Sequence, residues 1–365
     1  MEYGKLKKWQ KEVKRFTDLQ QEDERFREVI ELVAPGTPLR IGIDFIVQAQ
    51  LGGLIVLGVP KNKKIIEVGF EVNKDFSPTK LYEISKMDGA IILNKKAGKI
   101  LYNNVHLHPN TNIQSDETGT RHKVSERFAK QTGLPVIAIS KKRNVVTVFT
   151  GNTKYILKYI PELLAEATQA VSMYEHYSVI FGNTMDNITT LELNGTVVLA
   201  DIVNAIIRYF NSKKMLRVIG RKIAELGAAG NILKLRMQEI NQDLREGQYL
   251  IRDYITPEAE RHEKDIIRTL EMFSEFNYLE PLNVAAVMGY PESQFAMEQR
   301  LDSRGYRLLS RVPRLTENSV NQIIKNFGSF AKIIAASGKE IAQTSGVSEA
   351  SANNLKEYLL NMRTK

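Results

Sequence analysis

Apolar residues follow two different spacings along the 365 residues of this chain. Up to about residue 155, short runs rich in Ile, Val and Phe alternate with segments in which apolar residues recur every three or four positions. From residue 156 the short runs cease and the spacing of three and four dominates. Short apolar runs are typical of strands, and the longer spacing is typical of amphipathic helices. The pattern predicts an α/β part followed by a helical part.

Three helices and six strands are predicted in the first part. Thr37 and Ser77 each precede a proline, which favours a helix start because the hydroxyl caps the helix and proline suits its first turn. The predicted helices cover residues 38–50, 78–86 and 120–132, the last ending at Gly133. The predicted strands are Leu54–Val59, Lys64–Val72, Ala90–Leu93, Lys99–Val105, Val136–Ser140 and Asn144–Thr150. This interleaving indicates an α/β domain with a central mixed sheet over residues 1–155.

The remainder is predicted to form two helical domains. Helical spacing without intervening strands indicates a helical spine over residues 156–280, which we expect to serve spacing and assembly. After Glu280-Pro281, glycine and proline separate short helices, predicted at Asn318–Phe327, Ser329–Ala336 and Ser348–Asn361. Residues 281–365 are therefore taken as a third domain. The expected fold class is a multi-domain chain, α/β followed by all-α.

Residues 1–15 form a basic arm. They carry six Lys or Arg against two Glu and include the only tryptophan, Trp9. Leu6, Trp9, Val13 and Phe16 have helical spacing, so an amphipathic helix is predicted. It either packs on the body of the protein or contacts an acidic partner.

Composition narrows the class of protein. No stretch approaches 18 uninterrupted apolar residues, and no apolar core follows the charged start, so neither a membrane span nor a secretory signal is expected. Zero cysteines exclude disulfides and thiolate metal sites and fit the reducing cytoplasm, the expected location. A net charge of +9 suggests a polyanionic partner, either nucleotide or nucleic acid, or else simply a soluble basic protein.

Asp88-Gly89-Ala90 is the first candidate for chemistry, because a carboxylate stands directly before a buried-type strand. The strand would hold the carboxylate rigidly. Glycine at the next position lets a ligand approach the backbone closely. The alternative is an ordinary Asp-Gly turn, which Asp88 only stabilises.

Gly119-Thr120-Arg121-His122-Lys123 is the second candidate. It opens a helix with free backbone N–H groups and positive side chains, which suits an anion such as a nucleotide phosphate. Cations at a helix N-terminus otherwise oppose the macrodipole by roughly 0.3–1 kcal/mol each. The alternative is a solvated helix start.

Two further groups carry weaker signals. The turn Ser140-Lys141-Lys142-Arg143 is either a phosphate clamp or a charged hairpin tip. His106 and His108 lie in a predicted loop over residues 106–116, and without nearby carboxylates they are taken as solvated rather than metal-binding.

Residues 344–350 are similar to a helix-hairpin-helix, in which the turn between two short helices offers backbone N–H groups to a DNA phosphate without reading bases. The surrounding residues 311–365 carry eight Lys or Arg against four Glu, which is compatible with such a role. The alternative is a small packing domain.

Taken together, these residues resemble the DNA-integrity scanning diadenylate cyclases of bacteria, from about Val33 to about Leu360. The resemblance is densest in the runs Val33-Ala34-Pro35-Gly36-Thr37-Pro38-Leu39-Arg40, Gly52-Gly53-Leu54-Ile55-Val56, Phe76-Ser77-Pro78, Lys86-Met87-Asp88-Gly89-Ala90-Ile91-Ile92-Leu93, Glu117-Thr118-Gly119-Thr120-Arg121-His122 and Arg304-Gly305-Tyr306-Arg307-Leu308-Leu309. It implies a diadenylate cyclase domain, a helical spine and a helix-hairpin-helix DNA-binding domain. It also implies a homo-octamer without membrane attachment, whose cyclase domains meet face to face.

The implied reaction joins two ATP into cyclic di-AMP and releases two pyrophosphates, coupled to binding of branched DNA such as four-way junctions. By this resemblance, Asp88, Gly89, Arg121 and His122 are catalytic, and Asp88 and His122 hold Mg²⁺ or Mn²⁺. ATP would be bound by Asp88, Gly89, Ala90, Leu107, Thr120, Arg121, His122, Lys123, Ser140, Lys141 and Arg143. DNA would be bound by Gly346, Val347 and Ser348.

Some residues depart from the family's pattern. Lys123 and Val124 stand where the family usually has Arg and Thr, so a planar bidentate cation and a hydroxyl are lost from the first helical turn. Ser348 stands where the hairpin usually has glycine, and Ala350 where a basic residue often follows. The alternative function is accordingly a DNA-scanning binding protein with a weakened or inactive cyclase domain.

Overall fold

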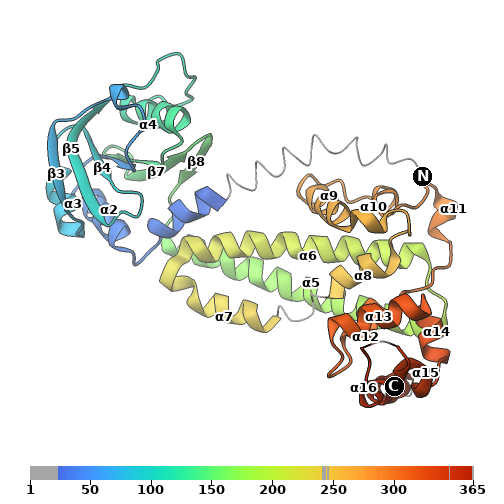
Figure 1. The fold of residues 1–365 in the computed structure, drawn as a ribbon. Coiled ribbons are helices and arrows are strands. Elements are labelled where there is room, and N and C mark those ends of the chain that lie inside the picture. The colour runs from blue at the N-terminus through green and yellow to red at the C-terminus, as the bar shows by residue number, and fades with distance from the viewer. Residues whose placement is uncertain (1–23, 241–243, 245, 345, 364–365) are drawn as a thin grey trace. The chain divides into compact units, whose positions relative to one another are not determined.

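The structure is a computed structural model that describes residues 24–240, 244, 246–344 and 346–363 (Figure 1). The predicted basic arm therefore lies outside the described residues. The described part forms two compact units. One covers the residues up to 169 together with 219–235, and the other covers 170–218 together with the residues from 236 onward.

The first unit is built on a mixed sheet, as predicted. The strand order is β2-β5-β4-β1-β6-β7-β8, and β3 pairs with β5. Among the described strands, β1 and β4 pair in parallel and the other pairs are antiparallel. The strands are β1 Gly53–Leu57, β2 Ile66–Glu67, β3 Phe70–Asp75, β4 Ala90–Leu93, β5 Lys99–Leu107, β6 Val136–Ser140, β7 Val145–Thr150 and β8 Thr153–Ile156.

Helices cover both faces of this sheet (Figure 1). They are helix 24–32, α2 Pro38–Gln48, α3 Pro78–Ile84 and α4 Thr120–Thr132. Alternate residues of β1 point to opposite faces, so Ile55 packs in the cluster with α2 and α3, and Val56 packs in the cluster with α4.

The predicted helix starts at Pro38 and Pro78 and the predicted end at Gly133 are confirmed, whereas α2 and α3 each end two residues earlier than predicted. The Thr37 and Ser77 hydroxyls each accept a hydrogen bond from the backbone N–H three residues on, at 3.2 Å, and each precedes proline at the first helical position. Gly133 ends α4 in the left-handed conformation, with φ of 68°.

Two expectations for the strands were wrong, and one strand was missed. The run Lys64–Val72 is not one strand, because a 3₁₀ turn (η1, Lys63–Ile65) and a break before Phe70 divide it. His106 is not in a loop, because β5 continues to Leu107 and His106 pairs with Glu67. The short strand β8 was not predicted; it pairs with β7 after the turn at Gly151.

The rest of the described chain is helical, as predicted. The helices are α5 Ile160–Asn194, α6 Leu199–Leu226, η2 Gly227–Gly230, α7 Asn231–Ile240, α8 Glu246–Tyr254, η4 Glu260–His262, α9 Glu263–Glu275, α10 Pro281–Val287, α11 Gln294–Met297, α12 Tyr306–Ser310, α13 Glu317–Phe327, α14 Phe330–Ala335, α15 Gly338–Ala342 and α16 Glu349–Arg363. One buried apolar cluster extends from Phe181 to Met297 and another from Leu308 to Leu359. No helix in the described ranges has the length and apolar character needed to cross a membrane.

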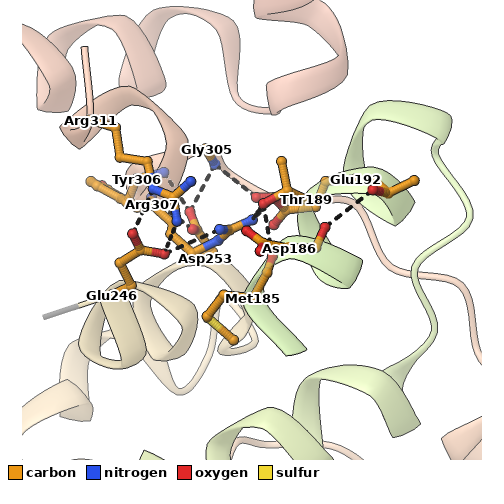
Figure 2. Close-up of polar contacts among 12 residues, drawn as sticks. Met185, Asp186, Thr189, Glu192, Glu246, Asp253, Gly305, Tyr306, Arg307 and Arg311 are labelled. Carbon is orange, nitrogen blue, oxygen red and sulfur yellow. Dashed lines mark hydrogen bonds and ion pairs between the residues drawn. The ribbon is translucent and has the colours of Figure 1, made fainter. Parts of the chain in front are cut away.

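A buried ionic network lies at the start of α12 in the second unit (Figure 2). The Arg307 side chain is fully buried and donates from Nη2 to Glu192 Oε2 at 2.5 Å and to Thr189 Oγ1 at 3.0 Å. Its Nη1 donates to Glu246 Oε2 at 3.4 Å. Tyr254 Oη donates to the other oxygen of Glu192 at 2.7 Å. Arg307 thus joins α5, α8 and α12.

Asp253 of α8 caps α12 from a distant part of the chain (Figure 2). Its carboxylate accepts hydrogen bonds from the backbone N–H groups of Gly305 at 2.8 Å, Tyr306 at 2.6 Å and Arg307 at 3.0 Å. These are donors that the first turn of a helix leaves without internal partners. Burial and the charge of Glu192 raise the pKa of Asp253 to about 7, against the opposing effect of the N–H donors.

We expect Arg307→Met to destabilise this part of the protein by about 3–5 kcal/mol, because the Glu192 carboxylate would stay buried without its cation. Hydrogen exchange of the α12 and α5 backbone measures the effect. Arg311→Met is the control, since the Arg311 side chain pairs with Glu246 but is 28% exposed, and such pairs contribute roughly 0–1 kcal/mol. Equal loss of protection in both variants would contradict the importance of the buried pair.

Candidate functional site

Sheet register places several predicted site residues at one edge of the sheet. Parallel pairing of Ile55 with Ile91 brings the N-terminal ends of β1 and β4 to the same edge. The C-terminal ends of β6 and β5 reach that edge too, because Gly53 pairs with Ile139 and Ala90 pairs with Val105. Asp88, Leu107 and Ser140 therefore lie at strand ends along a single edge.

Asp88 stands in a tight turn that precedes β4. Its side chain is exposed, whereas Ala90 is completely buried at the start of the strand. Gly89 has φ of 90°, and a Cβ placed on it would lie 2.9 Å from the backbone of Asn104. Position 89 therefore requires glycine for two reasons: the backbone conformation disfavours a side chain, and Asn104 leaves no space for one.

The N-terminus of α4 is positive, and its first turn has neither a capping side chain nor an acidic residue. Gly119 is the N-cap and no side chain caps this terminus, while the backbone N–H of Lys123 donates to the Gly119 carbonyl at 2.8 Å. The first turn contains no acidic residue but does contain Arg121 and Lys123. This arrangement favours an anion at the helix start.

Arg121 links this helix start to the sheet. A Cβ on Gly52 would lie 2.0 Å from Arg121 Nη1, so the guanidinium rests against the Gly52 backbone just before β1. The Ser125 hydroxyl donates to the Arg121 carbonyl at 2.7 Å. Arg121 is thus brought to the same edge as the Asp88 turn, as a nucleotide site built from both candidate motifs requires.

His122 has a different environment. Its ring meets the Phe149 ring edge to face, with 6.2 Å between centroids. Burial lowers the pKa of His122, partly opposed by the charge of Glu117. The imidazole is therefore neutral at pH 7, which is the form that binds metals.

The basic turn between β6 and β7 lies at the same edge. Lys141, Lys142 and Arg143 are exposed, and the Arg143 backbone N–H donates to Ser140 Oγ at 3.3 Å. These cations lie beside the strand end that carries Ser140, where a phosphate clamp was predicted.

The loop before α4 is held by side chains that the sequence did not single out. Glu126 is buried and accepts from Lys130 at 2.8 Å and from Ser115 at 2.5 Å. These bonds lower the pKa of Glu126, although its burial acts in the opposite direction. Arg127 Nε donates to the Ile113 carbonyl at 2.8 Å. Together they tether residues 110–117 along α4 and so support the Gly119 cap.

One cavity of this unit lies away from these residues. It has a volume of about 790 Å³ and lies at the opposite end of β1, where Leu57, Pro135 and Thr150 line it. The predicted site residues are absent from its lining. The Asp88 side chain is exposed and Arg121 is partly exposed, so this edge of the sheet is accessible to a ligand.

The predicted DNA-binding turn joins α15 to α16. Gly346 is exposed and has φ of 81°, and Val347 is buried in the C-terminal apolar cluster. Ser348 Oγ accepts from the Ser351 backbone N–H at 3.1 Å and so caps α16. Ser319 Oγ donates to the Gly346 carbonyl at 3.0 Å and holds the turn against α13.

Comparison with known proteins defines the class. Residues 40–154 match the model of the DisA bacterial checkpoint controller nucleotide-binding region, and residues 157–297 match the model of the DisA linker region. The chain therefore belongs to the class of proteins in which a nucleotide-binding α/β domain is followed by a helical linker.

Curated relatives identify the family. DNA integrity scanning protein DisA of Bacillus subtilis (strain 168) is 39% identical over 342 residues, covering 92% of this chain and 94% of the relative. The protein of the same name from Carboxydothermus hydrogenoformans is 38% identical over 343 residues, covering 93% and 97%. The chain belongs to the DNA integrity scanning diadenylate cyclase family.

Gly52→Ala is expected to displace the Arg121 guanidinium, because the new Cβ would occupy its position. A nucleotide triphosphate should then bind about 10- to 100-fold more weakly, since a charge-assisted hydrogen bond contributes about 1.5–3 kcal/mol. Equilibrium binding of a non-hydrolysable ATP analogue measures this. Gly98→Ala is the matched control, since nothing lies within 4 Å of a Cβ there. Unchanged affinity in Gly52→Ala would show that Arg121 does not contact the nucleotide.

Proposed function

We propose that this chain is a metal-dependent diadenylate cyclase, which joins two ATP into cyclic di-AMP with release of two pyrophosphates. The observation that carries the proposal is the single sheet edge that holds both the Asp88-Gly89 turn and the Arg121 guanidinium from the start of α4. Nucleotidyl transfer requires little covalent chemistry from the protein. Positioning and charge stabilisation supply most of the rate.

The residues divide into two roles. Asp88 would hold the divalent metal or draw the proton from the attacking 3′-hydroxyl, and Gly89 allows close approach to the backbone. The phosphates are held by cations and hydroxyls of two elements, and Leu107 lines the nucleoside side. The phosphate-binding residues are Thr120, Arg121, His122, Lys123, Ser140, Lys141 and Arg143.

The donor set fits Mg²⁺ or Mn²⁺ held jointly with substrate. Within the described ranges, no three His, Asp or Glu residues gather closely enough to hold a metal by themselves. Mg²⁺ typically takes one or two carboxylates, several waters and substrate phosphates, so a single exposed Asp88 suffices when ATP supplies the rest. Neutral His122 is available as a further ligand. When bound, the metal would stabilise charge on the reacting phosphate.

The exposed Asp88 and the exposed basic turn at residues 141–143 support a half-site. One such surface holds a single ATP, and a second copy facing it would bring the 3′-hydroxyl of one nucleotide to the α-phosphate of the other. We therefore propose a homo-oligomer with paired cyclase domains, such as an octamer. Catalysis would require both faces.

Asp88→Asn is expected to abolish cyclic di-AMP formation, because an amide neither binds the metal as an anion nor accepts the proton. Mass spectrometry of an ATP incubation with Mg²⁺ or Mn²⁺ measures the product. Asp75→Asn, which alters an exposed carboxylate at the end of β3, is the control. Wild-type protein that binds ATP but forms no product would instead favour a DNA-scanning scaffold with an inactive cyclase domain, for which Lys123 and Val124 are the candidate causes.

The C-terminal turn supports binding of branched DNA through phosphates. Its exposed Gly346 and the capped start of α16 present backbone groups as a helix-hairpin-helix does, and Ser348 satisfies the cap despite replacing glycine. Contacts to phosphates alone would recognise the shape of a junction rather than its sequence.

Gly346→Ala should weaken four-way junction binding about 5- to 30-fold, since a left-handed conformation costs an L-residue roughly 1–2 kcal/mol. Gel shifts at several salt concentrations measure this. Gly195→Ala, a left-handed glycine in the turn between α5 and α6 with open space around it, is the control. Wild-type affinity that stayed constant as salt rose would argue against phosphate contacts.

A further inference from the structure

Strand β5 is kinked beside the candidate active site. Asn104 has φ of 52°, in the left-handed region that Asn tolerates better than most residues. The pairing of β5 with β4 shifts register across this point, between the pairs Ala90–Val105 and Ile92–Tyr102. Such irregularities redirect side chains and often lie next to active sites.

Two glycines from neighbouring segments close on Asn104. A Cβ on Gly89 would lie 2.9 Å from its Cα, its carbonyl carbon and its Oδ1. A Cβ on Gly69 would lie 2.5 Å from its carbonyl oxygen and 3.0 Å from its Cβ. Asn104 is therefore wedged between Gly69 and the glycine that follows Asp88.

The preceding residue holds the other side of the same turn. Asn103 is buried, and its Nδ2 donates to the Met87 sulfur at 3.2 Å. Met87 and Gly89, the two neighbours of Asp88, are thus each held by β5. Asp88 itself remains exposed between them.

We propose that Asn104 is a positioning residue for the cyclase reaction: its side chain, wedged between Gly69 and Gly89, fixes the turn that presents Asp88. The inference rests on the proposed function and deepens it. Asn104 acts through Gly89 and needs no contact with ATP. Because a misplacement of about 1 Å at a reacting group can cost about 100-fold in rate, the wedge matters more for turnover than for ATP binding.

Asn104→Gly tests the side chain alone, since glycine adopts the left-handed conformation readily and preserves the kink. We expect kcat to fall about 10- to 100-fold, while the affinity for a non-hydrolysable ATP analogue stays within about 3-fold. Asn73→Gly is the matched control, because Asn73 also has positive φ (43°) but lies exposed on β3. Equal kcat in Asn104→Gly and Asn73→Gly would overturn the proposal.

Gly69→Ala tests the wedge from its other side. The new Cβ would force the Asn104 carbonyl to move, although Gly69 is not among the proposed ATP contacts. We expect the same loss of kcat with retained analogue affinity, and no such loss in Gly98→Ala. A fall in analogue affinity equal to the fall in kcat would indicate general damage to the domain and would also overturn the proposal.

Hydrogen exchange separates this inference from the proposed function. Residues 86–90 should exchange faster in Asn104→Gly than in Asn73→Gly, whether or not wild-type protein forms cyclic di-AMP. Absence of product in wild type would refute the cyclase function. Unchanged exchange at residues 86–90 would refute the wedge.

Discussion

The parallel pairing of β1 with β4, within an otherwise antiparallel sheet, is the constraint on which the candidate site depends. Parallel strands begin at the same edge, so the glycines before both strands and the Asp88 turn lie side by side there. That edge leaves room for the Arg121 guanidinium because Gly52 has no side chain. The positive start of α4 is thereby brought to the same edge as the exposed carboxylate. An antiparallel arrangement of these two strands would have placed their starts at opposite edges.

The second unit depends on a different kind of interaction. Arg307 and Asp253 bury charge where helices from separate parts of the chain meet, and each charged group has several hydrogen-bond partners. Buried charges are costly unless they are paired and hydrogen-bonded, so this arrangement is specific in its geometry. This ionic network gives the run Arg304-Gly305-Tyr306-Arg307 a structural role. The run has no role in the proposed nucleotide or DNA sites. Arg304 adds to the joint by donating to the carbonyls of Arg252 and Ile255 at 2.6 and 2.8 Å.

Much of the fold could be predicted from local pattern. The caps at Thr37 and Ser77, the left-handed Gly133 and most strands of the sheet follow from residues close in sequence. The exceptions cluster near the site. The break in the run Lys64–Val72 lies where Gly69 meets Asn104, a contact between segments 35 residues apart that no periodicity reveals. The loop ties of Glu126 and Arg127 were missed for the same reason, since they join an ordinary amphipathic helix to a polar loop.

The sequence by itself determined the family, the order of an α/β part and a helical part, and the residue types at the candidate site. It could do so because helix caps, turns and apolar spacing are set by neighbours within a few residues. Only the tertiary structure decided which of these residues meet. Arg121 rests on Gly52, and Asp253 caps a helix more than 50 positions later in the sequence. Asn104 packs between Gly69 and Gly89. Such contacts depend on strand register and helix packing, which a single chain specifies only when it is folded.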